Sequence, residues 1–448
     1  MHKLVSAVEK HRERIENAYE FFWKNPETGY KEWKGHKYLA DEFRALGYEL
    51  TEAGNIPGFY TDVVTGRPGP TVLVMGEMDS LLCTTHPEAN PETGAVHSCG
   101  HCCQVAALLG LAAALKEPGV LDDLCGTVRL MAVPAEELIE VEYREKLRQE
   151  GVIRYYGGKV EFMHRGYMDG TDVAFMIHTS GAPSNTGSVP RGSNGCISKE
   201  IIFSGVAAHA GGAPDKGINA LYAANLAMNA INALRETFRD DDHIRIHPIV
   251  THGGVVVNAI PDYVRLESYI RGATLDAILA ANEKVNRAVA ACAAAMGAKV
   301  LIKDRPGYSP RVHDLGMMRL AKEAMEEIMT CNYNETAWGT GCSDLGDVSM
   351  VFPAVHPYVG GAIGTGHGND YYIADVETAC VGSAKVQANM LVKLLENDAE
   401  RAWQIKKNFK PTFATMEDFF RCIDGIFMDR EAVSYNEDGT ITMNFAKK

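Results

Sequence analysis

Three apolar runs in this chain each end where polar residues begin, and this pattern constrains the fold more than any other feature. The runs and the residues that follow them are 70–75 with Asp79, 127–133 with Glu136 and Glu137, and 172–177 with His178. Runs of this kind, without alternation, are typical of strands buried on both faces. Because the carboxyl ends of parallel strands meet at one edge of an open sheet, we expect these polar residues to gather there. The pattern predicts an α/β domain with a central, mostly parallel sheet.

The pattern of apolar and polar residues changes near Gly195. Strand-like and helix-like segments follow one another in the order β-α-β-β-α-β, which is typical of a ferredoxin-like α+β unit. A chain of 448 residues is also too long for one compact core. We therefore expect an inserted domain within the α/β domain. The expected boundaries are 1–194 and 309–397 for the α/β domain, 195–308 for the inserted domain and 398–448 for a C-terminal extension.

Composition and charge exclude several classes of function. A formal net charge of −14 argues against a nucleic-acid or anionic-membrane partner, because both bind basic surfaces. No apolar stretch approaches the roughly 20 residues that span a bilayer, and residues 1–14 resemble a charged amphipathic helix rather than a signal peptide. The eleven cysteines are dilute and odd in number, which favours reduced thiols. We expect a cytoplasmic protein.

The segment 97–101 offers ligands for a metal ion. Cys99 and His101 flank a single glycine, so a thiolate and an imidazole come close together, as Zn²⁺ or a similar first-row metal requires. Alone, such a pair is as consistent with a small apolar thiol and a capping histidine at a helix start. Glu136 and Glu137 strengthen the metal interpretation, because one carboxylate of a pair can bind a cation while its neighbour moves protons.

Two more histidines, His178 and His367, would complete a two-metal site. His178 ends an apolar run, whereas His367 lies among glycines and has little to pack against. Asp79 is either a turn or helix-capping residue or a carboxylate that orients a metal-binding imidazole.

Three further polar residues lie within the expected inserted domain. His209, in a glycine-rich segment, would on its own be a loop histidine. Asn258 and Arg271 are ordinary polar residues unless a substrate carboxylate lies nearby, which an amide and a guanidinium would suit.

Several segments, in order, resemble the motifs of one family. The chain is similar over about residues 15–395 to the M20 metallopeptidases and amidohydrolases. The similarity points to the branch that contains the indole-acetyl-amino-acid hydrolases and aminobenzoyl-glutamate hydrolase. The segments that carry the resemblance are 25–32, 77–79, 97–101, 133–137 and 343–349.

The resemblance implies a role for each candidate residue. Glu136 would be the general base and then the acid, and Asp79 the carboxylate that orients a ligand. His209, from the lid domain of a partner subunit, would polarise the scissile carbonyl, while Asn258 and Arg271 would hold the substrate carboxylate. The implied ligands of two divalent metal ions are Cys99, His101, Glu137, His178 and His367.

The resemblance also implies a reaction and an assembly. The reaction is hydrolysis of the amide bond of an N-acyl amino acid, an aminobenzoyl-glutamate-like conjugate or a small dipeptide, by attack of metal-bound hydroxide. The assembly is a homodimer through residues 195–308, which would form the lid and dimerisation domain. Softness of the ligands favours Zn²⁺, whereas relatives of this branch often use Mn²⁺, so the metal stays open between the two.

The chain departs from the family pattern at several positions. Cys102, Cys103 and Gln104 stand where the family usually has an Asp and often a His. Glu77 replaces the more usual Asp, and the stretch 138–170 is longer and more charged than we expect.

These departures leave two alternatives to metal-dependent hydrolysis. One is a cysteine-dependent amidase in which His101 activates Cys99, Cys102 or Cys103. The other is a catalytically inactive binding descendant of the fold. The presence of both Glu136 and Glu137 argues against an inactive descendant, because a site without chemistry has no use for a base.

Overall fold

The computed structural model describes residues 2–445, and the chain divides into two compact units, neither of them continuous in sequence. Unit 1 comprises residues 1–192, 311–338 and 343–414, and unit 2 comprises residues 193–310, 339–342 and 415–448. Each unit has its own hydrophobic core.

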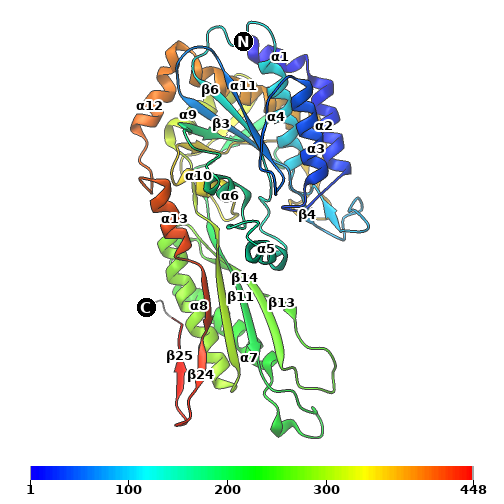
Figure 1. The fold of residues 1–448 in the computed structure, drawn as a ribbon, viewed down its shortest axis with the longest axis vertical. Helices are drawn as coiled ribbons and strands as arrows, with labels where there is room; N and C mark the ends of the chain where they lie inside the picture. Colours follow the sequence, from blue (N-terminus) through cyan, green and yellow to red (C-terminus); the bar gives the residue numbers. More distant parts are fainter. Residues whose placement is uncertain (1, 446–448) are drawn as a thin grey trace. The chain divides into compact units, whose positions relative to one another are not determined.

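Unit 1 is built on a six-stranded sheet in the order β1-β2-β6-β3-β7-β19. Its strands β3 and β6 are labelled in Figure 1. The strand β3 runs parallel to both β6 and β7, and β19 runs parallel to β7. Two pairings at one edge of this sheet are antiparallel, β1 with β2 and β2 with β6. The strands are β1 (Thr51–Glu52), β2 (Phe59–Val64), β3 (Thr71–Glu77), β6 (Thr127–Val133), β7 (Val173–Phe175) and β19 (Ala354–Val355).

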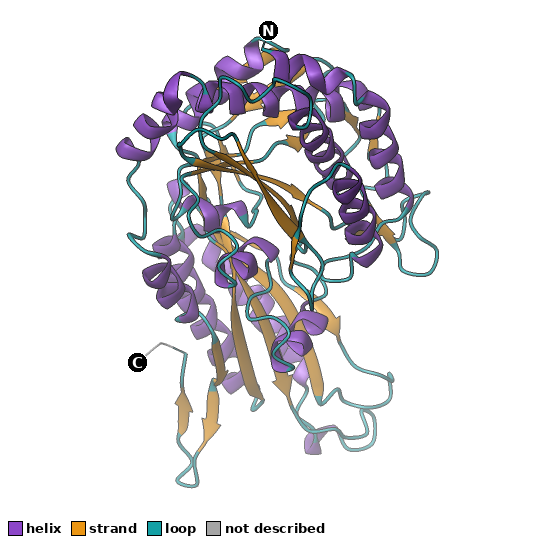
Figure 2. Cartoon of the chain, turned by 45° about the horizontal axis from the view of Figure 1, so that its top comes forward, coloured by secondary structure: helices purple, strands orange, loops and turns teal. Residues whose placement is uncertain are grey.

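Helices cover this sheet and enclose the core of unit 1 (Figure 2). Every residue of α4 (His101–Leu115) is buried, because it packs on β3 on one side and on α2 and α11 on the other. This sandwiched position explains why its sequence is apolar all round rather than amphipathic. The other helices of unit 1 are α1 (Lys3–Glu9), α2 (Arg12–Lys24), α3 (Trp33–Ala45), α5 (Val141–Gln149), α6 (Gly158–His164), α9 (Leu315–Glu326), α10 (Leu345–Ser349), α11 (Ser383–Leu395) and α12 (Glu400–Asn408).

A second, smaller sheet of unit 1 has the order β17-β9-β20-β8. In it β20 runs parallel to β8, with Tyr358 opposite His178. The strands are β17 (Thr330–Tyr333), β9 (Thr186–Val189), β20 (Tyr358–Val359) and β8 (His178–Thr179). Unit 1 also contains two short antiparallel strand pairs, β4 (Leu81–Leu82) with β5 (Ala95–Val96) and β21 (Ala362–Ile363) with β22 (Tyr372–Ile373).

Unit 2 is an antiparallel sheet covered by two helices. Its strand order is β12-β14-β11-β15-β23, and β13 also pairs with β14. Buried residues alternate along β14, because α7 and α8 cover one face of the sheet. The elements are β11 (Gly195–Ser204), α7 (Ala220–Ala233), β12 (Arg245–Ile246), β13 (Ile249–His252), β14 (Tyr263–Gly272), α8 (Leu275–Ala295), β15 (Lys299–Tyr308), α13 (Met416–Asp424), β23 (Met428–Glu431), β24 (Val433–Tyr435) and β25 (Ile441–Met443).

One buried ion pair lies inside unit 2. Lys199 of β11 is fully buried, and its Nζ donates to Asp304 of β15. The same Nζ donates to Asn286 Oδ1 at 2.6 Å, and Asn282 Nδ2 donates to Asp304 Oδ2 at 2.7 Å. Both charges are therefore compensated within the core.

The predicted α/β class is confirmed, with a mainly parallel sheet and a separate α+β unit. Locally the structure differs from the sequence-based expectations. The N-terminal region forms three helices, α1, α2 and α3, rather than the single helix expected over residues 1–14. The expected C-terminal extension, 398–448, divides between the two units, because α12 belongs to unit 1 whereas β23 joins the sheet of unit 2.

Among the described helices, none combines the length and the apolar character that crossing a membrane requires.

Candidate metal centre

The candidate site of unit 1 lies where β3 and β6 end and α4 begins. Gly100 precedes α4 with a φ of 93°, a conformation that glycine adopts at no steric cost. On the other side, Ala135 has a φ of 58°. This left-handed conformation is costly for alanine, and it turns the chain after β6 so that Glu136 and Glu137 follow at once.

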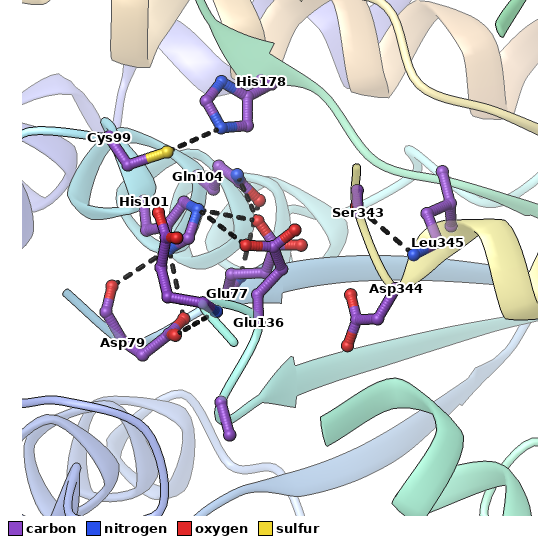
Figure 3. Close-up of polar contacts among 12 residues, drawn as sticks. Glu77, Asp79, Cys99, His101, Gln104, Glu136, His178, Ser343, Asp344 and Leu345 are labelled. Carbon is purple, nitrogen blue, oxygen red and sulfur yellow. Dashed lines mark hydrogen bonds and ion pairs between the residues drawn. The ribbon is translucent and has the colours of Figure 1, made fainter. Parts of the chain in front are cut away.

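His101 is held in one tautomer by Asp79 (Figure 3). Its Nδ1 lies 3.0 Å from the carbonyl oxygen of Asp79 and 3.1 Å from Asp79 Oδ1. Both atoms are acceptors, so Nδ1 carries a proton, and Nε2 is the ring atom that is left to bind a cation. Asp79 also accepts a hydrogen bond at 2.7 Å from the backbone N–H of Glu137. One carboxylate thus fixes a candidate ligand and the loop that carries the glutamates.

His178 is oriented in the same way by a backbone carbonyl. Its Nδ1 donates to the oxygen of Thr179 at 2.6 Å, so its Nε2 has a free lone pair. That Nε2 lies 3.5 Å from Cys99 Sγ. Burial, together with the nearby charge of His101, lowers the pKa of His178 to about 4. The ring is therefore neutral at physiological pH, as a metal ligand must be.

His367 also lies near Cys99. It has a φ of 65°, and its N–H donates to the carbonyl of Ser98 at 2.8 Å. This strained conformation brings His367 Nε2 within 3.2 Å of Glu137 Oε1. Within residues 2–445, that buried oxygen has no hydrogen-bond donor.

These side chains fit two divalent cations. The ligand atoms of Cys99, His101 and His178 all lie within 4.8 Å of one another, and so do those of Cys99, Glu137 and His367. Thiolate, imidazole and carboxylate form a donor set that suits Zn²⁺ and other first-row cations. The buried His101 Nε2 has no hydrogen-bond partner in the described part of the chain, which is what a ligand position requires.

Glu136 lies beside this centre and is not a member of either group. Its side chain is 9% exposed, and its Oε2 lies 3.9 Å from His101 Nε2. Burial and the charges of Glu77 and Glu137 raise the pKa of Glu136 well above its usual value. A carboxyl group in such surroundings is suited to accept a proton and return it near neutral pH.

The other three candidate residues belong to unit 2. His209 and Ala259 form an isolated β-bridge, so His209 lies close to Asn258, whose carbonyl accepts from Ala210 N–H. Both His209 and Asn258 are exposed. Arg271 lies on β14 with its guanidinium 5.2 Å from the ring centre of Tyr269.

The sequence did not single out a buried ionic cluster behind His101. Lys159 Nζ donates to Glu77 Oε1 and to Asp344 Oδ1, and all three side chains are fully buried. Gln104 Nε2 donates to Glu77 Oε2 at 2.7 Å. Gly158 allows Lys159 to approach, because a Cβ there would lie 1.7 Å from the carbonyl oxygen of Pro134. The sequence does not indicate that a lysine within a charged stretch is buried. The segments around residues 77 and 344 were recognised only as family motifs.

Cys102 and Cys103 point away from solvent. They lie on α4, where they are 0% and 1% exposed. Burial raises the pKa of the Cys102 thiol well above its usual value. At Cys103 burial has the same effect, but hydrogen bonds with Cys102, Cys380 and Thr179 outweigh it and lower the pKa. Burial of both sulfur atoms nevertheless disfavours attack on a substrate that enters from solvent.

Comparison with known proteins places this geometry among hydrolases. A model of the peptidase dimerisation domain matches residues 191–299. The chain is 28% identical over 379 residues to the Xaa-Arg dipeptidase of Homo sapiens, which covers 80% of this chain and 79% of the relative. It is 30% identical over 289 residues to thermostable carboxypeptidase 2 of Saccharolobus solfataricus, covering 62% and 68%. It is 27% identical over 274 residues to one of the subunits of p-aminobenzoyl-glutamate hydrolase of Escherichia coli, covering 57% and 50%.

Solved structures share the fold. One is a Bacillus subtilis protein described as a dinuclear metal binding peptidase, with a TM-score of 0.64 at 20% identity; the match covers 86% of this chain and 99% of that one.

Proposed function

Because the chain belongs to the M20 family of metallopeptidases and amidohydrolases, we propose that this hydrolytic enzyme cleaves the amide bond of small acyl-amino acids. The proposed substrates are an N-acyl amino acid, an aminobenzoyl-glutamate-like conjugate or a small dipeptide. The relatives named for Xaa-Arg dipeptides and for aminobenzoyl-glutamate support this range. Both kinds of substrate contain an amide bond next to a carboxylate.

One observation carries the proposal. Cys99 is shared by two groups of possible ligands, one with His101 and His178 and the other with Glu137 and His367. Glu136 is buried beside them and is kept out of both groups. This is the arrangement that hydrolysis of an amide needs: ligands for cations, with a separate carboxylate for proton transfer.

Two cations bound by these ligands would lower the pKa of a bound water and polarise the amide carbonyl. The protein's own groups carry the protons. Glu136, whose pKa is raised by burial and by the charges of Glu77 and Glu137, accepts a proton from the attacking water and returns it to the leaving amine. Asp79 holds a proton on the Nδ1 of His101, which leaves Nε2 as the ligand atom. Thr179 does the same for His178 through its carbonyl oxygen.

His209 is suited to stabilise the developing oxyanion. Its Nδ1 accepts hydrogen bonds from the N–H groups of Gly211 and Gly212, at 3.1 and 2.9 Å. The ring proton of neutral His209 therefore resides on Nε2, which is left as a donor. In our proposal this donor bonds the substrate carbonyl oxygen, and Asn258 and Arg271 bind the substrate carboxylate.

We propose that His209 acts across a homodimer formed through unit 2. The match to a peptidase dimerisation domain over residues 191–299 supports such an assembly. The strand β13 is exposed along its whole length and pairs only with β14 among the described strands. Its open edge and the exposed Ile249 and Val250 are suited to pair with a second copy.

The test is a measurement of metal content together with hydrolysis. Protein stripped of metal and reloaded with Zn²⁺ or Mn²⁺ is assayed against a panel of N-acyl amino acids, aminobenzoyl-glutamate and dipeptides. We expect about two cations per chain and release of a free amino acid from at least one substrate class. Absence of turnover in the fully loaded protein with every class would contradict the proposal.

A further inference from the structure

Arg144 is a buried arginine whose guanidinium bonds to the backbone on both sides of Glu136. It lies on α5, in the charged stretch 138–170, and is 1% exposed. Its Nη1 donates to the carbonyl oxygen of Ala135 at 3.3 Å, and its Nη2 donates to that of Glu137. We propose that Arg144 is a positioning residue, which fixes Glu136 beside the cation ligands by holding both of its neighbours. The inference rests on the proposed function in taking Glu136 as the proton carrier.

The two residues that flank the proton carrier are each held at both of their backbone groups. The N–H of Ala135 donates to Glu32 Oε1 at 2.7 Å, and its carbonyl accepts from Arg144. The N–H of Glu137 donates to Asp79 Oδ2 at 2.7 Å, and its carbonyl also accepts from Arg144. Ala135 needs such support, because its φ of 58° is a left-handed conformation that is unfavourable for alanine. Glu32 holds one flanking residue and Asp79 the other, whereas Arg144 holds both.

The space around Arg144 fits a guanidinium. A Cβ at Gly29 would lie 2.3 Å from Arg144 Nη2 and 2.9 Å from Ala135 Cα, so a glycine there leaves room for both groups. Arg144 Nη1 also donates to the carbonyl oxygen of Tyr156 at 2.6 Å. One planar fork of donors thus serves three carbonyl oxygens. A lysine ammonium cannot reproduce this arrangement, because its donors share a single nitrogen.

Other contacts anchor α5, so Arg144 is not needed to attach this helix to unit 1. Just before the helix, Glu140 Oε1 accepts from Lys31 Nζ at 2.5 Å. Within the helix, Glu145 Oε2 accepts from the hydroxyl of Tyr156 at 2.5 Å. A change at Arg144 should therefore leave α5 in place and release the loop that carries the proton carrier.

The test compares two arginines of α5 in the metal-loaded full-length protein, with the substrate class that the panel identifies. Arg144→Lys keeps the charge and removes the fork, whereas Arg148→Lys makes the same change at a guanidinium that pairs with Glu145 at 2.8 Å. We expect Arg144→Lys to lower kcat by about 10- to 100-fold, as a displacement of about 1 Å at a catalytic group does, while KM changes less than about threefold. Arg148→Lys should change neither constant by more than about threefold. Because Asp79 still holds Glu137, both variants should retain the cation content of the wild type.

A double-variant cycle separates positioning from general support of the fold. In the Glu136→Gln background no proton carrier is left to position, so adding Arg144→Lys should lower the residual kcat by less than about threefold. Equal losses in both backgrounds, or a kcat of Arg144→Lys that matches that of Arg148→Lys, would overturn the inference. A Glu136→Gln variant with the kcat of the wild type would contradict the proposed function.

Hydrogen–deuterium exchange tests the hold on the loop without reference to activity. The N–H groups of Ala135 and Glu137 should exchange at least about tenfold faster in Arg144→Lys than in the wild type or in Arg148→Lys. Unchanged exchange would overturn the inference even if kcat falls. If Arg144→Lys does not fold, Gly29→Ala keeps the arginine and displaces its guanidinium, with the same expected losses of kcat and of protection. Fast exchange in Arg144→Lys, together with a wild type that hydrolyses no substrate, would contradict the proposed function and not the hold on the loop.

Discussion

Replacing Glu136 by Gln is the most direct perturbation of the proposed chemistry. The amide keeps the shape of the side chain and cannot accept a proton. General acid–base catalysis contributes about 10²- to 10⁴-fold to a rate. Because Glu136 is only 9% exposed, bulk water has little access to replace it, and we expect the upper half of that range. A loss of about 10³- to 10⁴-fold in kcat corresponds to roughly 4–5.5 kcal/mol of activation free energy.

The assay combines steady-state kinetics with metal analysis of the zinc-loaded protein. Glu136→Gln should leave KM and the content of two cations per chain nearly unchanged, because Glu136 belongs to neither thiolate-containing group. Glu137→Gln is the comparison, since Glu137 faces His367 at 3.2 Å and its loss should remove a cation. If the Glu136 variant loses metal and the Glu137 variant retains it, the roles of the two glutamates are reversed.

The pH profile provides an independent measurement. Glu136 must be ionised to accept a proton, so kcat/KM should rise with pH through its pKa, which burial and the charges of Glu77 and Glu137 raise. This acid limb should be absent from the residual activity of the Gln variant. A drop of less than about tenfold, or an unchanged acid limb, would refute the assignment of Glu136 as base.

Three further predictions concern the lid, the core of unit 2 and the cations. The His209→Ala variant should lose activity without losing metal. If His209 acts across a dimer, mixing this variant with the Glu136→Gln variant should restore some activity. Mixed dimers without recovery would count against that arrangement. The Lys199→Met variant leaves Asp304 buried without its positively charged partner. Denaturant unfolding should show that unit 2 is destabilised by about 3–5 kcal/mol. Adding Asp304→Asn in a double variant should recover most of this loss of stability. Exhaustive chelation should abolish turnover and lower the unfolding temperature, because cations bind the folded state preferentially, and activity that survives chelation would favour the cysteine-dependent alternative.

The sequence predicted the parts of the site that follow directly from strand ends. Glu136 comes shortly after β6, and His178 begins the short strand β8, so a buried apolar run was enough to locate both. The same pattern predicted the sheet itself. These features depend on residues close together in the chain, which is where sequence patterns are informative.

The cluster around Lys159 could not be predicted, because it depends on contacts between distant residues. Lys159 and Asp344 are 185 positions apart, and Lys159 and Glu77 are 82 apart. Nothing in a charged segment indicates which lysine is buried with two carboxylates. The pairing of β23 with β15 was missed for the same reason, since strand partners far apart in sequence leave no local pattern.

The pairing of β23 with β15 has a consequence for synthesis of the protein. Residues 428–431 form the edge of a sheet whose other strands lie between residues 195 and 308. During translation those earlier strands emerge first, and the edge of β15 stays unpaired until residues 428–431 have left the ribosome. An unpaired edge is a template for intermolecular pairing. The segment 428–431 therefore decides how long the nascent protein is exposed to aggregation, and any truncation that removes it acts on folding yield before it can act on catalysis.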